Sequence, residues 1–415
     1  MGRENTTEFR TKSGIEIHDF SDITWKRMSG MKELTRRGVL YVGFLCDINC
    51  RICYYRYMPK EQRPWKDIRN LKALCNKFRF YYRNHEVDIT GGEPTIYPKI
   101  FELLKYCSLI GLKPSIITHG QNLSPKRSKQ FQEAGINDFL VSVHGLEKSH
   151  DYITNTKNGF NKVMGSLDNL NDIGVPFRIN TVLTKYSCND LPKLAELFKT
   201  KDAKQVNFIS FNPFSEWCSK PQIEFQAKHS DFTKPLSKAI DILEEDNIKV
   251  NVRYFPFCML PGHEKNISGF CQVPYDLKEW DYASMHGFII DQVRRFRSLD
   301  EFYYKTARRT ILRLSKENKK CRKCSAEFIC DMLFYQYHNR FGDDELKPIN
   351  PIDEKIANPL YFKLNKYTLE NQQEIVKKIK KKEELSEKEK KARNEIVERP
   401  RLYGLNKHNQ KEKTK

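Results

Sequence analysis

Short apolar runs alternate with segments of helical periodicity over the first 250 residues of the chain. The first run, VLYVGFL at residues 39–45, is rich in β-branched and aromatic side chains and predicts a buried strand. Five more runs predict strands, each followed by a helical segment: EVDIT, KPSIIT, DFLVSV, PFRINTVL and QVNFISF. The predicted helices lie near residues 99–107, 124–134, 161–173, 190–199 and 236–246. Strands alternating with helices form parallel βα units, and six units favour an α/β fold with an open, partial (β/α)6 barrel over a closed eightfold barrel.

The pattern changes twice after this alternation. It stops near Asn251, and residues 251–345 hold two cysteine groups in aromatic-rich sequence, which indicates a small second domain. From Leu346 charged residues dominate and only a thin apolar stripe remains, so we expect a solvated helix and a disordered end. The expected division is an N-terminal extension (1–37), a partial barrel (38–250), a small domain (251–345) and a basic tail (346–415).

The net charge of +20 narrows the function only slightly. A basic body suits an anionic substrate or nucleic acid, but it also suits solubility alone. Because the chain lacks a clustered arginine–aromatic segment such as an RNA-binding signature, nucleic-acid recognition is the less favoured interpretation. No stretch approaches the ~20 apolar residues that cross a bilayer, and the N-terminus lacks the apolar run of a signal peptide. We expect a cytoplasmic protein without a membrane partner.

The candidate chemistry of the chain rests on its twelve cysteines. In a cytoplasmic chain they favour metal ligands or buried thiols over disulfides. The segment CDINCRICYY places Cys46, Cys50 and Cys53 directly after the first predicted strand, at the carboxyl-terminal mouth of the barrel. A single zinc ion needs four ligands, and no fourth lies nearby in the sequence. Three thiolates can instead hold a cubane cluster and leave one iron open to a small molecule.

This Cys-x3-Cys-x2-Cys spacing resembles the signature of the radical S-adenosylmethionine (SAM) superfamily, and Tyr54 and Tyr55 fit the aromatic residue usual near the third cysteine. At the end of the second predicted strand, Gly91, Gly92, Glu93 and Pro94 resemble the GGEP loop of that family. The resemblance implies that the three cysteines hold a [4Fe–4S] cluster and that the GGEP loop binds the amino group of SAM. Alone, the cysteines would also suit a zinc knuckle and GGEP a turn. One strand apart, the two motifs favour the family.

Weaker similarities follow at later strand ends. The segment THGQN lies where the family often has Thr-Asn-Gly, with His119 in place of the asparagine. By resemblance, Ser142 and Asn180 would bond the ribose or carboxylate of SAM, and Arg178, on the same strand face as Asn180, would meet a carboxylate. Ordinary polar groups at strand ends explain each of these residues equally well.

Two histidines and an aspartate near the fourth predicted strand have the chemistry of acids or bases. For His144 and His150, a structural role with satisfied hydrogen bonds is the favoured interpretation. Asp151 is expected to cap or turn the loop that follows.

A second group of cysteines lies in the small domain, and it comprises Cys258, Cys271, Cys321, Cys324 and Cys330. The Cys-x2-Cys-x5-Cys step of the last three resembles the SPASM and twitch extensions of radical SAM enzymes. A full SPASM extension needs further cysteines, and none follows Cys330, so we expect a twitch-like domain with one auxiliary [4Fe–4S] cluster. Which four cysteines bind it stays open, and a structural zinc on the same residues is the alternative.

The resemblance implies an enzyme in which a reduced cluster passes an electron to SAM. The carbon–sulfur bond then breaks, and the resulting 5′-deoxyadenosyl radical takes a hydrogen atom from the substrate. A flavodoxin or ferredoxin would supply the electron. We expect a peptide or protein substrate, matured or crosslinked oxidatively; a small-molecule dehydrogenase or epimerase is the second hypothesis. A third, from another class, is an electron-transfer or scaffold iron–sulfur protein that does not cleave SAM, although an intact GGEP loop argues against it.

The segment EWDYASMHGF, residues 279–288, is dense in aromatic and acidic residues. Asp281, Tyr282 or His286 would be proton or hydrogen donors if it lined a substrate pocket. Packing of the small domain is the favoured interpretation, so the sequence names no catalytic acid or base.

Overall fold

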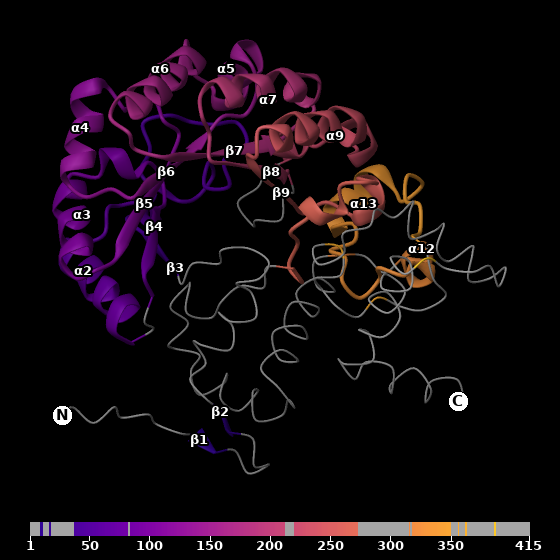
Figure 1. Ribbon diagram of the computed structural model, residues 1–415, viewed down its shortest axis with the longest axis horizontal. Coiled ribbons are helices and arrows are strands. Elements are labelled where there is room, and N and C mark those ends of the chain that lie inside the picture. The colour runs from indigo at the N-terminus through magenta and orange to yellow at the C-terminus, as the bar shows by residue number, and fades with distance from the viewer. Residues whose placement is uncertain are drawn as a thin grey trace.

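The fold positions its functional loops along one edge of a curled parallel sheet (Figure 1). The computed structural model describes residues 37–81, 84–211, 220–272, 315 and 318–349, with short pieces at 9–10, 16–17, 356, 362 and 386. The strands are β1 Phe9–Arg10, β2 Glu16–Ile17, β3 Arg37–Tyr41, β4 Glu86–Thr90, β5 Lys113–Thr118, β6 Asp138–Ser142, β7 Phe177–Leu183, β8 Gln205–Ser210 and β9 Lys249–Arg253. The longer helices are α2 Ile68–Asn76, α3 Ile100–Leu109, α4 Pro125–Glu133, α5 Glu147–Thr154, α6 Gly159–Asp172, α7 Leu191–Thr200 and α9 His229–Glu245. The shorter ones are η1 Lys60–Gln62, η2 Lys77–Tyr81, η3 Pro94–Ile96, η4 Cys188–Asp190, α8 Lys220–Ile223, η5 Phe257–Met259, η6 Glu264–Asn266, α12 Lys319–Lys323 and α13 Tyr335–Phe341.

Strands β3 to β9 lie side by side in chain order, and each pair is parallel. The helices from α2 to α9 cover the outer face of the arc (Figure 1). This is the open α/β partial barrel that the alternation predicts. The six predicted βα units are present, and β9 adds a seventh strand beside β8. Strand β9 also crosses the expected boundary at residue 250, and the division of the chain into domains stays a prediction.

Alternation along the strands separates an outer apolar face from a concave polar one. In β7 the buried residues Phe177, Ile179 and Leu183 belong to the hydrophobic core that the helices cover. Arg178, Asn180 and Val182 alternate with the buried residues and are half-buried. Because side chains alternate across a strand, these three lie on the opposite, concave face.

An ion network ties the lower part of the concave face together. Arg37 on β3 lies 3.1 Å from Asp88 on β4, and Arg178 on β7 lies 2.9 Å from Asp138 on β6. Arg178 also approaches Asp88 to 3.6 Å across the intervening strands. Burial raises the pKa of Asp88, and the charges of Arg37 and Arg178 oppose that shift. These pairs link four strands of a sheet that does not close on itself.

The segment after β9 packs against the end of the barrel and shares its core. Phe257 and Tyr337 belong to the same hydrophobic cluster as the strands. The Tyr337 hydroxyl accepts a hydrogen bond from the backbone N–H of His229, at the start of α9, with an N···O distance of 2.7 Å. Within the described part of the chain, no helix is both long and apolar enough to cross a membrane.

Candidate functional site

The cysteine loop begins just after β3 and lies at the carboxyl edge of the sheet. Cys46 is exposed, whereas Cys50 and Cys53 are half-buried. The end of α5 holds the middle of this loop, because Arg51 donates its backbone N–H to Ile153 O (2.8 Å) and its Nε–H to Tyr152 O (2.9 Å). The loop is therefore supported by a helix that follows β6 in the chain.

The GGEP loop after β4 docks directly on the cysteine loop. The N–H of Gly92 donates to Gly43 O (2.9 Å), and the N–H of Glu93 donates to Leu45 O (2.8 Å). A Cβ atom at Gly91 would lie 2.0 Å from Gly43 O, and one at Gly92 would lie 1.9 Å from Leu45 O. These glycines thus allow two backbone segments to approach each other closely, in addition to any close approach of a ligand.

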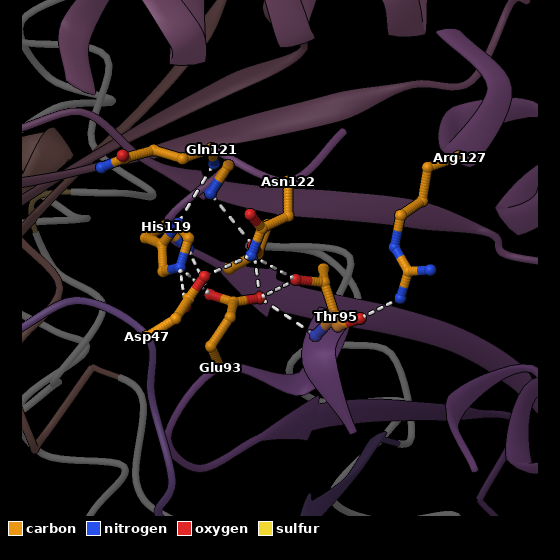
Figure 2. A network of polar contacts seen from close by, with 9 residues as sticks. Asp47, Glu93, Thr95, His119, Gln121, Asn122 and Arg127 are labelled. Atoms are coloured by element: carbon orange, nitrogen blue, oxygen red, sulfur yellow. Dashed lines mark hydrogen bonds and ion pairs between the residues drawn. The ribbon is translucent and has the colours of Figure 1, made fainter. Parts of the chain in front are cut away.

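The carboxylate of Glu93 is buried, with 1% of the residue exposed, and it is held by the ends of two strands. Its Oε1 accepts hydrogen bonds from the N–H of Thr95 (3.0 Å) and from the hydroxyls of Thr95 and Thr118 (2.7 Å each). Its Oε2 accepts the backbone N–H of His119 at 2.9 Å. Figure 2 shows this carboxylate at the centre of the polar network.

Asp47, which directly follows Cys46, joins the same network from the cysteine loop (Figure 2). One of its oxygens lies 2.8 Å from His119 Nε2, and the other accepts the Asn122 side-chain amide at 2.9 Å. Although partial burial raises the pKa of Asp47, the hydrogen bonds from His119 and Asn122 lower it more, to about 2. For His119, burial lowers the pKa, but the charges of Glu93 and Asp47 outweigh it and leave the pKa raised.

Cys46, Asp47 and His119 place one ligand atom each within 4.8 Å of one another, which has the outline of a metal site. The hydrogen bonds argue against that assignment. The Nδ1 atom of His119 accepts the N–H of Gln121 at 3.1 Å, so the ring proton sits on Nε2 and faces the Asp47 carboxylate. In the structure His119 and Asp47 are thus engaged in a hydrogen-bonded network, with Nε2 of His119 donating to Asp47.

The chemistry of the three thiols fits an iron–sulfur cluster. Burial and the neighbouring charges of Cys53 and Cys46 raise the pKa of Cys50, and burial raises that of Cys53. Three thiolates at this point would repel one another unless a cationic centre bound them, because metal ligation deprotonates thiols. The backbone N–H of Tyr55 also points at the Cys53 sulfur, 3.4 Å away.

The remaining predicted cofactor residues lie at different levels of the sheet. Ser142, at the carboxyl end of β6, is the register partner of Asn180 in the middle of β7. Arg178 lies one step lower and is engaged by the ion network described above. Tyr55 packs its ring on Phe44, with 4.6 Å between centroids. Pro94 is buried at the first position of η3. Their contacts with a cofactor stay predictions.

The Nδ1 atoms of His144 and His150 make hydrogen bonds of the kind expected for structural histidines, but Nε2 of His150 is buried without a hydrogen-bond partner among the described residues. The Nδ1 atom of His144 accepts the N–H of Val182 (3.3 Å), and Nδ1 of His150 accepts the N–H of His144 (3.2 Å). Asp151 accepts the N–H of Phe160 at 2.8 Å and so fixes the turn between α5 and α6. Residues 279–288, with Asp281, Tyr282 and His286, lie outside the described residues.

Beyond the barrel, four of the five second-group cysteines line one cavity: Cys258, Cys321, Cys324 and Cys330. The fifth, Cys271, points its thiol at Phe328 O, 3.7 Å away. Burial and then the charge of Cys258 raise the pKa of Cys330. Backbone N–H groups also point at two of the sulfurs, from Ile349 to Cys324 and from Met332 to Cys330, both at 3.3 Å.

Two residues of the barrel network, Asp47 and Asn122, were not among the site residues predicted from the sequence. Both belong to segments that the sequence had singled out, the cysteine loop and THGQN. Their positions inside these two motifs were the available signal. Nothing in the spacing indicates that a side chain after β3 meets one after β5.

Comparisons with known proteins address the same region. Residues 40–198 match the family described as the radical SAM superfamily. The AdoMet-dependent heme synthase of Methanosarcina barkeri is 28% identical over 127 residues, which cover 30% of this chain and 35% of that protein. The cysteine-type anaerobic sulfatase-maturating enzyme of Clostridium novyi is 26% identical over 257 residues, 55% of this chain and 67% of that protein. Among solved structures, SuiB of Streptococcus suis bound to its precursor peptide SuiA is 18% identical with a TM-score of 0.45, covering 61% of this chain and 53% of that one.

The heme synthase match thus spans about a third of that protein's length. The family match covers the barrel strands from β3 through β7 and both motifs of the candidate site, the cysteine loop and the GGEP loop. Proteins of this family use a [4Fe–4S] cluster and SAM, as the two motifs imply. Residues 40–198 of this chain form a radical SAM domain.

Proposed function

We propose that this protein cleaves SAM reductively and uses the resulting 5′-deoxyadenosyl radical to take a hydrogen atom from a peptide or protein. The observation that carries the proposal is the joined pair of loops at the carboxyl edge of the sheet. The cysteine loop offers three thiols, and the GGEP loop is hydrogen-bonded to its backbone at two points. A cluster with three protein ligands, when bound there, would supply an electron and an open iron for SAM.

In this proposal Cys46, Cys50 and Cys53 hold the cluster, and the backbone of the GGEP loop lies beside them to receive the methionine end of SAM. Ser142 and Asn180, paired on β6 and β7, would meet the ribose or carboxylate. Arg178 is the less favourable candidate, because Asp138 and Asp88 already neutralise its guanidinium.

We further propose that Cys258, Cys321, Cys324 and Cys330 hold one auxiliary [4Fe–4S] cluster. Zinc–sulfur bonds of about 2.3 Å place the thiolates of a zinc site roughly 3.8 Å apart. Among the described residues, no three of these four sulfurs lie within 4.8 Å of one another. The wider arrangement favours a cluster over zinc. Four protein ligands leave no iron open, so this cluster would accept an electron rather than ligate the substrate.

The substrate class rests on the sulfatase-maturating relative, whose match is the longer of the two reported above. A fully ligated auxiliary cluster suits the oxidative maturation of a peptide, because the substrate radical must give up an electron. A small-molecule substrate is the second candidate, and the heme synthase relative favours it. The electron itself would come from a flavodoxin or ferredoxin.

The test uses anaerobically reconstituted protein, in which iron, sulfide and 5′-deoxyadenosine are measured after SAM and dithionite are added. About eight irons per chain and SAM cleavage are expected. The variant Cys46→Ala/Cys50→Ala/Cys53→Ala should keep about four irons and lose cleavage. Cys324→Ser should lose the other set of about four, and the matched variant Cys271→Ser should keep all of them.

Full cleavage in the triple variant would refute the radical proposal. Four irons together with one zinc in the wild type would refute the auxiliary cluster alone. Candidate peptides and small molecules are then compared by their stimulation of 5′-deoxyadenosine formation.

A further inference from the structure

Asp47 is held at two points by side chains from another loop (Figure 2). His119 Nε2 lies 2.8 Å from one carboxylate oxygen, and Asn122 Nδ2 lies 2.9 Å from the other. Both partners follow β5, whereas Asp47 follows β3. Two bonds to the two oxygens of one carboxylate fix its orientation as well as its position.

His119 is the buried anchor of this contact. The residue is 8% exposed, whereas the side chain of Asp47 is 39% exposed. Its backbone N–H donates to Glu93, and its Nδ1 accepts the N–H of Gln121. The ring is therefore oriented before it meets Asp47, and its Nε2–H points at the carboxylate. His119 therefore contacts the GGEP loop through its backbone and the cysteine loop through its ring.

Cys46 needs such support more than the other two thiols. It is the exposed member of the set, and its neighbours Leu45 and Asp47 are exposed as well. Cys50 and Cys53 lie on the part of the loop that α5 holds through Arg51. An exposed loop segment without a side-chain anchor samples many conformations, and a ligand on it binds more weakly for that reason.

We propose that His119 and Asn122 are positioning residues that hold Asp47, and through it Cys46, in the geometry that takes up and retains the cluster of the cysteine loop. This inference rests on the proposed function, because it assumes a cluster at that loop. Partners of this kind around metal ligands typically contribute about 10- to 100-fold to metal retention.

The two ring nitrogens of His119 allow a matched pair of variants. Glutamine reaches as far as Nε2 and keeps a donor for Asp47, whereas asparagine reaches only as far as Nδ1. His119→Gln should therefore retain the hydrogen bond to Asp47, and His119→Asn should lose it. The family often carries asparagine at this point. Asn122→Ala removes the second bond. Asn171→Ala, which removes a side-chain amide hydrogen bond from α6 to Lys201 O just after α7, is the control.

The measurement is the rate at which a chelator removes iron from reconstituted protein, together with the electron paramagnetic resonance (EPR) spectrum of the reduced protein. The auxiliary cluster in the same molecule is the internal reference. In His119→Asn and Asn122→Ala, one set of about four irons should leave roughly tenfold or more faster, while the other set keeps its rate. His119→Gln and Asn171→Ala should behave as the wild type. A variant that assembles only the auxiliary set also supports the inference, because that set reports an intact fold.

Equal iron loss in wild type and His119→Asn would overturn the inference. Faster loss of both sets in the variants would overturn it too, since it would mean general destabilisation. Failure of the proposed function looks different, because the wild-type protein would then lack the first set of irons altogether.

Discussion

His144 and His150 are buried imidazoles whose hydrogen bonds require the neutral ring. Each accepts a backbone N–H at Nδ1, so neither can gain a proton there without losing that bond. Burial, followed by the charge of His150, lowers the pKa of His144 to about 3. Burial, followed by the charge of His119, lowers that of His150 to about 4. At the scale of the residue, these two rings therefore stabilise the fold only while they are neutral, which makes their contribution sensitive to acid.

Acid should therefore destabilise the protein well above the pKa values of its carboxylates. A histidine free in the unfolded chain titrates near 6.5. Because its folded pKa is depressed, its contribution to stability is complete above that value and is lost as the pH falls toward the folded pKa. When the pH falls from about 7.5 to 5.5, each of the two rings should lower the free energy of unfolding by roughly 1 kcal/mol.

Denaturant titration of the cluster-free protein at the two pH values measures this loss. The variants His144→Asn and His150→Asn keep an acceptor near the position of Nδ1 but do not titrate, so each should flatten the pH dependence. An unchanged slope in both variants would assign the acid sensitivity to other groups.

At the scale of the element, the contact between the loops after β3 and β4 decides the geometry of the site. Each loop follows its strand at the same edge of the sheet, and the register pairs Tyr41 with Thr90 at the strand ends. The backbones of the two loops then meet without intervening side chains, which only glycine permits. The cysteines and the GGEP motif are thus one structural unit built from two strand ends.

Gly92→Ala should separate these two loops. Its Cβ would lie 1.9 Å from Leu45 O, and a backbone atom cannot give way as a flexible side chain does. We expect a loss of about 1–3 kcal/mol in stability, with poor cluster assembly on the cysteine loop. The control is Gly165→Ala in the interior of α6, where no described atom lies within 4 Å of the added methyl. This control should gain about 1 kcal/mol, because alanine favours the helix.

Thermal melts and iron counts of the two variants measure the difference. Wild-type iron content in Gly92→Ala would show that the loop contact is dispensable.

At the scale of the whole molecule, one hydrophobic core runs from the barrel strands into the cysteine-lined cavity. Strand β9 leads from the sheet toward this second region, and α13 packs on the start of α9 through Tyr337 and His229 (Figure 1). The Tyr337 hydroxyl in turn donates to Glu345. The two cysteine sets therefore belong to one continuous framework.

The parts of this framework that depend on residues close together in the sequence could be predicted from the sequence alone. Strand periodicity, the spacing of the cysteine loop and the GGEP motif each lie within a dozen residues. The strand β9, with the sequence KVNVR, was missed because the prediction rested on strands followed by a helical segment, and the helix that next follows β9 is the short η5. The contact of Asp47 with His119 joins residues 72 positions apart and depends on the register of three strands. The choice of Cys258 over Cys271 likewise depends on tertiary packing around one cavity.

The measurement closest to the central claim is the EPR spectrum of the reduced protein with and without SAM. The claim is that the cysteine loop, rather than the second set, provides the iron that SAM meets. The experiment uses Cys324→Ser, in which the auxiliary site is broken, beside the triple alanine variant of the cysteine loop. Addition of SAM should change the spectrum of Cys324→Ser and leave that of the triple variant as it was. An unchanged spectrum in Cys324→Ser, or a SAM-dependent change in the triple variant, would contradict the account.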